Sequence, residues 1–210
     1  NDKKILFSNT TNSGVELWVL DVASAQATKL TAATVNANLG NPFNWFSDNE
    51  TILVKMLPKN RPALLDSKKD LPTGPIVSNT SGEKSQNRTY PDMLKNKNDE
   101  ANFETSITSE LYKVKLNGDA VLFKEAAMFF GEKISPDGNY IMLTTIQKPF
   151  SYVVPLYRFP SKTIVYDIRG KEIKTGNEGP LNEIMPKGFM AVRKGKREMA
   201  WRNDKPATLM

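Results

Sequence analysis

Nothing in this chain of 210 residues can act as an imidazole base or a thiolate, because the sequence contains neither histidine nor cysteine. Without histidine, the chain cannot supply the general base that activates a serine nucleophile in a Ser-His-Asp triad. Without cysteine, it can form neither a disulfide framework nor a thiolate metal site. We therefore predict that the chain contains no catalytic residue of its own.

Other kinds of chemical site also lack their motifs. The stretch 96–104 is acidic, but it has no Asp-x-Asp-x-Asp-Gly loop, and phosphate-loop and dinucleotide motifs are absent, so we predict no metal and no cofactor. The densest basic cluster, residues 193–197, has no stacking aromatic residues among its charges. We interpret it as an exposed turn rather than a nucleic-acid patch. The net charge of +6 weakly favours acidic partners.

The side chains best suited to recognise a ligand lie in a loop rich in proline and aromatic residues, at positions 148–160. Its aromatic residues are Phe150, Tyr152, Tyr157 and Phe159. They could form the wall of a peptide groove, since aromatic side chains commonly line pockets. They could equally pack the loop against the strands beside it. Both interpretations stay open at this point.

Strands in a repeating order must hold this loop. The front half of a strand-turn-strand unit occurs at 46–54, 134–143 and 201–209, and the back half occurs at 16–22, 110–116 and 162–168. Front and back halves alternate, as they do in a β-propeller made of successive four-stranded blades. The predicted fold class is all-β, a partial β-propeller of four-stranded antiparallel blades with long inserted loops.

Turn residues and tryptophans refine this prediction. Hairpins are expected at Asp48-Asn49 and at Asn117-Gly118, because these residues accept the backbone dihedrals of tight turns. Trp45 and Trp201 occupy equivalent positions before blade turns, and we expect them to pack between blades. The strands and blades are expected at 3–8, 15–22, 28–31, 43–57, 109–125, 129–175 and, as the start of a fourth blade, 188–210.

One long segment interrupts the repeat. Residues 58–108 are rich in Pro, Lys, Asn and Ser, and two short helices are expected within them, at 92–96 and 99–104. A connection of this length is uncommon in a compact domain and is usually functional or mobile. We interpret it as an insertion between the second and third strands of one blade.

The ends of the chain suggest a piece of a longer protein. The chain begins at Asn1 and enters a strand pattern at once, and it stops at Met210 inside an expected strand. No apolar run approaches the roughly 20 residues of a membrane-spanning helix. We therefore expect residues 1–210 to form an N-terminal propeller fragment of about three blades plus parts of others.

Several segments carry a resemblance to a known family. In order along the chain these are Pro75, Arg88-Thr-Tyr-Pro-Asp-Met-Leu-Lys-Asn96, Asp99-Glu100, Phe103, Ser135-Pro-Asp-Gly138, Lys148-Pro-Phe-Ser-Tyr152, Tyr157-Arg-Phe-Pro160 and Trp201-Arg-Asn-Asp-Lys-Pro-Ala-Thr-Leu209. Together they closely resemble the propeller of the prolyl oligopeptidase superfamily of serine peptidases. The branch containing the glutamyl endopeptidases is the best match.

This resemblance implies a function for the parent protein. In that family a propeller caps a C-terminal α/β-hydrolase domain, which carries the triad with its serine in a Gly-x-Ser-x-Gly elbow. The elbow is missing here, so the hydrolase domain is absent and the chain alone is expected to be inactive. The implied partners are a peptide substrate and the hydrolase domain in cis. Bacterial members of the branch often carry an export signal, which implies a periplasmic or secreted location.

The resemblance also implies substrate-binding residues. A peptidase that prefers glutamate needs a cation for the substrate carboxylate, and arginine binds a carboxylate with two parallel hydrogen bonds. Arg158 and Arg88 lie in matching segments and are the candidates, with Tyr152 and Tyr157 beside Arg158. Alternatively, each arginine pairs with a nearby acidic side chain and only holds its own loop.

Two other functions remain compatible with the sequence. The first is a free-standing TolB-like propeller that binds a protein or peptide without cleaving it. The second is a glycan-binding propeller, and only the aromatic residues favour it. In either case an incomplete propeller has unpaired strand edges, so we expect the fragment to form edge-mediated dimers.

Overall fold

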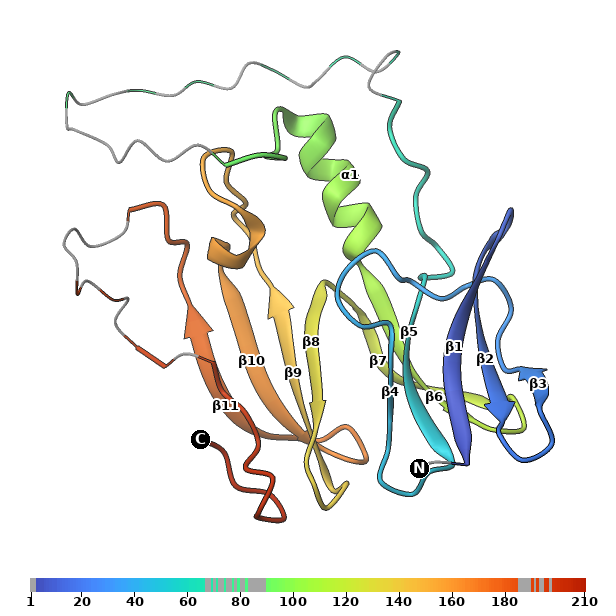
Figure 1. Cartoon of the computed structure of the whole chain (residues 1–210). Coiled ribbons are helices and arrows are strands. Elements are labelled where there is room, and N and C mark those ends of the chain that lie inside the picture. The colour runs from blue at the N-terminus through green and yellow to red at the C-terminus, as the bar shows by residue number, and fades with distance from the viewer. Residues whose placement is uncertain are drawn as a thin grey trace.

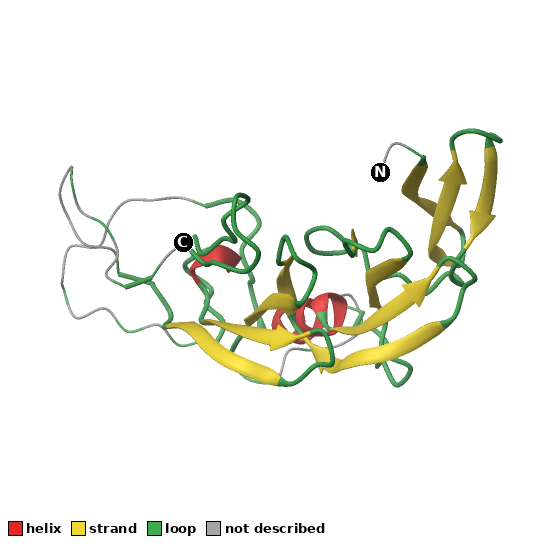
Figure 2. Ribbon diagram, turned by 90° about the horizontal axis from the view of Figure 1, so that it is seen from below, coloured by secondary structure: helices red, strands yellow, loops and turns green. Residues whose placement is uncertain are grey.

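The chain folds into three antiparallel β-sheets that stand side by side in an open arc (Figure 1, Figure 2). The computed structural model describes residues 3–66, 90–184 and 198–210, together with positions 69, 71, 74, 77, 79, 82, 190, 192, 195 and 196. Each sheet is built from consecutive strands, so the chain completes one sheet before it begins the next.

The sheets are simple up-and-down meanders. Sheet 1 contains β1 (Lys4–Thr11), β2 (Gly14–Asp21) and β3 (Gln26–Lys29). Sheet 2 contains β4 (Phe43–Trp45), β5 (Thr51–Met56), β6 (Ser109–Lys115) and β7 (Ala120–Ala127). Sheet 3 contains β8 (Phe129–Ile134), β9 (Tyr140–Ile146), β10 (Ser161–Asp167) and β11 (Glu172–Gly179).

This arrangement confirms the predicted fold class, an all-β partial propeller with long inserted loops. The two four-stranded sheets have the form of propeller blades, and the row of sheets does not close into a ring (Figure 2). After β11, the described residues form a single antiparallel bridge between Trp201 and Leu209.

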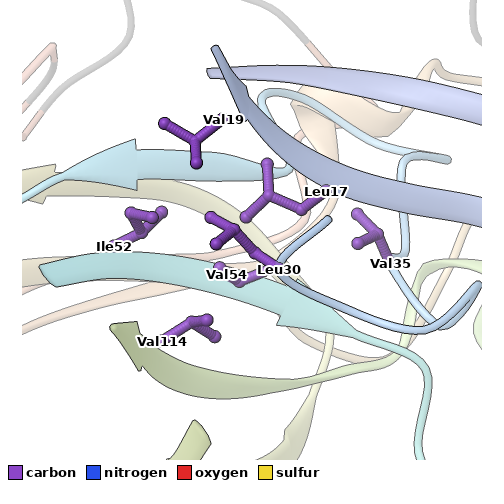
Figure 3. Close-up of a cluster of buried hydrophobic side chains, with 7 residues drawn as sticks. All are labelled: Leu17, Val19, Leu30, Val35, Ile52, Val54 and Val114. Carbon is purple, nitrogen blue, oxygen red and sulfur yellow. The ribbon is translucent and has the colours of Figure 1, made fainter. Parts of the chain in front are cut away.

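Alternation along the strands explains why neighbouring sheets pack face to face. Successive side chains of a strand point to opposite faces. On β5, Ile52 and Val54 therefore face sheet 1, where they join the buried cluster drawn in Figure 3. Leu53 between them faces sheet 3 and packs in a cluster with Ile141 and Leu143 of β9. Burying each such side chain contributes about 1.5–3 kcal/mol, so the sheets hold one another together.

Both tryptophans of the repeat lie where this packing needs large side chains. Trp201 is buried against Met142 and Val165 of sheet 3, and its indole N–H donates to the carbonyl of Lys133 at 2.9 Å. Trp45 packs against the cluster between sheets 1 and 2. The prediction that these residues pack between blades is confirmed.

One buried ion pair crosses the interface between sheets 2 and 3. Lys55 of β5 and Glu132 of β8 approach to 3.7 Å, and their side chains are only 3% and 4% exposed. Lys55 also donates a hydrogen bond to the carbonyl of Leu39. Burial lowers the pKa of Lys55 and raises the pKa of Glu132, because both charged forms lose their hydration.

Only one of the two expected helices is present. Helix α1 spans Lys97–Ile107, and the carboxamide oxygen of Asn96 caps its start by accepting from the backbone N–H of Asp99 at 2.9 Å. The acidic residues of its first turn complement the positive end of the helix dipole. The prediction of a helix at 92–96 is wrong. Asp92 has a left-handed φ of 55°, and Asn96, which caps helix α1, has an extended backbone.

Candidate functional site at the rim of the sheets

Two long connections meet on the same side of the arc, at the top of Figure 1. One joins β5 to β6 and ends in helix α1, and the other joins β9 to β10 and contains the short 3-10 helix η1 (Leu156–Arg158). Each links the second and third strands of its sheet. We call helix α1 and residues 148–160 together the rim cap, because they cover the ends of sheets 2 and 3.

Three phenylalanines hold the rim cap together. Phe103 of helix α1 meets the rings of Phe150 and Phe159 edge-on, with centroid separations of 5.2 and 5.9 Å. Phe150 and Phe159 stack on each other at 5.4 Å and are almost fully buried. Of the two interpretations of the loop aromatics, packing therefore applies to Phe150 and Phe159.

Tyr152 also ties the loop to the helix. Its hydroxyl donates to the Glu100 carboxylate, which accepts a second hydrogen bond from Lys97 at 2.7 Å. Burial would raise the pKa of Glu100, but these two hydrogen bonds outweigh it and hold the pKa below its ordinary value. Burial and the bond to Glu100 raise the pKa of Tyr152. The Tyr152 hydroxyl is thus already engaged within the cap.

The far end of helix α1 is held by a different part of the chain. Asn36, which is buried in the connection between β3 and β4, donates from its carboxamide to the carbonyls of Ser106 and Thr108 at 2.9 and 3.0 Å. Helix α1 is therefore anchored at one end to the loop of sheet 3 and at the other to the crossover that precedes sheet 2.

Tyr157 is the exposed aromatic residue of the loop. Its side chain is 58% exposed, and it lines a cavity of about 430 Å³ together with Leu156 and Phe159. Residues of sheet 3 also line it, including Thr144 and Thr163, whose hydroxyls are hydrogen-bonded to each other. The lining thus contains aromatic, aliphatic and polar side chains.

Arg158 is buried in the rim cap, and it has no acidic partner among the described residues. The residue is 7% exposed, and its guanidinium lies 5.3 Å from the ring centroid of Tyr90. Within residues 3–66, 90–184 and 198–210, its side chain makes neither an ion pair nor a hydrogen bond. The alternative in which Arg158 pairs with a nearby carboxylate therefore finds no support in the described part of the chain.

Tyr90 was not singled out from the sequence, although it lies in one of the segments that carry the family resemblance. Its hydroxyl is buried and has no hydrogen-bond partner among the residues that the structure describes. The sequence held a signal for it, because it stands two positions after the candidate Arg88. Arg88 itself lies outside the described residues, as do Pro75 and most of the basic cluster at 193–197.

The described residues contain neither a candidate metal cluster nor a candidate membrane-spanning helix. No three Asp or Glu side chains there lie close enough together to hold a metal ion. No described helix is both long and apolar enough to cross a membrane.

The sequence is similar to curated proteins that share one name. It is 36% identical over 205 residues to a protein named "Probable glutamyl endopeptidase, chloroplastic" from Oryza sativa subsp. japonica, covering 96% of this chain and 22% of that protein. A protein of the same name from Arabidopsis thaliana is 34% identical over 206 residues, with 96% and 21% covered. The chain thus spans about a fifth of the length of the curated relatives it matches.

Other comparisons add less. No family model matches the sequence. Among solved structures, a putative TolB from Agrobacterium tumefaciens aligns with a TM-score of 0.49 and 9% identity, covering 82% of this chain and 44% of that one.

The described sheets form a partial propeller, and the rim cap covers one end of sheets 2 and 3. Over nearly its whole length, the chain is similar in sequence to proteins named as glutamyl endopeptidases, which confirms the predicted resemblance.

Proposed function

We propose that this chain is the non-catalytic propeller part of a serine peptidase, where it covers the active site and limits which peptides reach it. One observation carries the proposal. The chain is 36% identical to a protein named as a glutamyl endopeptidase over 96% of its own length, yet it has no histidine to complete a triad. The catalytic groups must then come from a hydrolase domain in the same polypeptide.

The rim cap is the part of the propeller best suited to contact substrate. Binding usually resides in loops that a rigid scaffold positions, and the two longest connections of the described fold meet in this cap. Tyr157 is exposed beside a cavity, whereas Tyr152 is held inside the cap by Glu100. We therefore assign Tyr157 to direct substrate contact and Tyr152 to positioning of the loop.

The first test is peptide hydrolysis by the native full-length protein and by this 210-residue chain alone. Cleavage of Glu-containing peptides by the native protein, together with none by the chain, supports the proposal. A native polypeptide that ends soon after its last blade and binds peptides without cleaving them would instead establish the TolB-like alternative. Fractionation of the source cells tests our further proposal that the protein is periplasmic or secreted.

A second test addresses the limit on substrate size. In the full-length protein, Phe103→Ala should loosen the rim cap, because the ring holds both Phe150 and Phe159. We expect kcat/KM for long peptides to rise relative to kcat/KM for short ones. Val121→Ala, at an exposed position on β7, is the matched control. An unchanged ratio in a folded Phe103→Ala variant would remove the rim cap from any role in access.

A further inference from the structure

We infer that Arg158 and Tyr90 form a binding site for a carboxylate, and that an acidic peptide supplies it. The peptide rests on the proposed function, whereas the carboxylate rests on the geometry of these two residues. Both lie in the rim cap or at its border, one in η1 and the other at the end of the long connection before helix α1.

The guanidinium of Arg158 is a buried cation without an acidic partner among the described residues. Arginine is rarely buried unless it is paired, because its guanidinium carries five N–H donors and a charge that burial strips of water. Among the described residues, Lys55 is the one other lysine or arginine that is buried to this degree. Lys55 has Glu132 and the carbonyl of Leu39, but Arg158 has only the ring of Tyr90 within the described chain.

The hydroxyl on that same ring is also buried. Buried polar groups are hydrogen-bonded in the great majority of cases. Among the described residues, two buried side-chain atoms lack a hydrogen-bond partner, the Tyr90 hydroxyl and Glu132 Oε1. The Glu132 atom lies near Lys55, so its charge is still compensated. The Tyr90 hydroxyl has no such charge beside it in the described chain, and the Tyr90 ring contacts the guanidinium of Arg158, which also lacks a hydrogen bond to any described residue.

The backbone of Arg158 is held in place by hydrogen bonds on both sides. The backbone N–H of Arg158 donates to Pro155 at 2.9 Å, and its carbonyl accepts from Asn182 at 3.0 Å. The next residue, Phe159, belongs to the aromatic core of the cap. The arginine is therefore presented by a fixed backbone, which reduces the entropy that a ligand must overcome on binding.

Charge and geometry select a carboxylate. A single guanidinium offers one positive charge and a planar pair of N–H donors that matches the two oxygens of a carboxylate. The neutral Tyr90 hydroxyl adds a donor without adding charge. A phosphate dianion would leave a buried negative charge uncompensated, so this donor set fits a carboxylate better.

The test uses the native full-length protein with paired peptides that differ only as Glu or Gln at one position. Arg158→Lys keeps the charge but loses the planar fork, and we expect the Glu:Gln ratio of kcat/KM to fall about tenfold or more. Tyr90→Phe removes only the hydroxyl, and we expect a fall of about threefold or more in the same ratio. Because that hydroxyl has no partner in the free protein, Tyr90→Phe should leave stability unchanged or raise it. Arg202→Lys, at an exposed pair with Asp204, is the matched control.

Amidated and free C-termini on the same peptides separate two sources of the carboxylate. If kcat/KM depends on Glu against Gln, the site binds a side-chain carboxylate. If kcat/KM depends on the free against the amidated C-terminus, the site binds the terminal carboxylate. If both variants keep the wild-type ratios, the inference is wrong. If the wild-type protein cleaves none of the peptides, the proposed function fails, and calorimetric binding of the same peptides decides the site by the same comparison.

Discussion

The interface between sheets 2 and 3 and the rim cap above it are both buried, but they use their side chains differently. In the interface, Leu53 and Ile141 are nearly inaccessible to solvent and surrounded by apolar neighbours, and the buried charge of Lys55 meets Glu132. In the rim cap the guanidinium of Arg158, and at its border the hydroxyl of Tyr90, are buried without a hydrogen bond to any other described residue. In the described part of the chain, the charge buried in the interface has an opposite charge beside it, whereas the charge buried in the rim cap has none.

The largest effect should come from the apolar half of the interface. Leu53→Ala removes a side chain that is 1% exposed and leaves a cavity between two sheets. We expect the free energy of unfolding to fall by about 3 kcal/mol, measured by urea denaturation. Val121→Ala, at a position that is 67% exposed, should change it by less than about 0.5 kcal/mol. Equal losses in the two variants would mean that the sheets do not depend on this packing.

The polar half of the interface should be nearly as sensitive. Lys55→Met leaves the Glu132 carboxylate buried without its cation, and we expect a loss of about 3 kcal/mol at neutral pH. Replacing both residues, as Lys55→Met with Glu132→Leu, should recover most of that loss because no buried charge remains. A double variant as unstable as the single one would show that the residues act through shape rather than charge.

The same pair makes stability depend on pH. The folded pKa of Glu132 lies above its ordinary value of 4.5, because burial disfavours the charged form, so the folded state binds a proton more tightly than the unfolded state. Relative to the double variant, the wild-type protein should therefore gain stability as pH falls through the raised pKa, and the gain should stop below 4.5. A stability difference that is flat over this range would contradict the shift.

A smaller and more local effect is expected in the rim cap. Tyr152→Phe removes the hydroxyl that donates to Glu100, and we expect a loss of about 1–2 kcal/mol. Hydrogen exchange should become faster in helix α1, while amides of β9 and β10 keep their protection, because the blades do not rely on this bond. Faster exchange throughout sheet 3 would mean that the cap and the blade unfold as one unit.

The smallest effect concerns the free edge of sheet 1. Within the described chain β1 pairs only with β2, and Ile5 and Phe7 on it are exposed. We expect weak dimerisation through this edge, detectable by sedimentation at high concentration and reduced by Phe7→Lys, since lysine on an edge strand opposes pairing. A strict monomer at high concentration would exclude it.

The sequence was sufficient for the features that depend on local pattern. Strand alternation and the Asn117-Gly118 turn identify blades, and Gly118 indeed has a φ of 89°. The contact between Arg158 and Tyr90 could not be predicted, because it joins two insertions that are far apart in the chain. Tyr152 was chosen for its residue type alone, and its partner Glu100 becomes apparent only once helix α1 is placed. The absence of a helix at 92–96 could not be predicted either, because the residue types do not reveal the left-handed backbone of Asp92.

The hydrogen bonds of Asn36 give the rim cap a mechanical role. Helix α1 is fastened to the crossover before sheet 2 at one end and to the loop of sheet 3 at the other. It therefore bridges the interface between sheets 2 and 3. If sheets 2 and 3 were to move apart, helix α1 would first have to lose the hydrogen bonds at one of its ends. The separation of the two sheets and the position of the helix are therefore coupled.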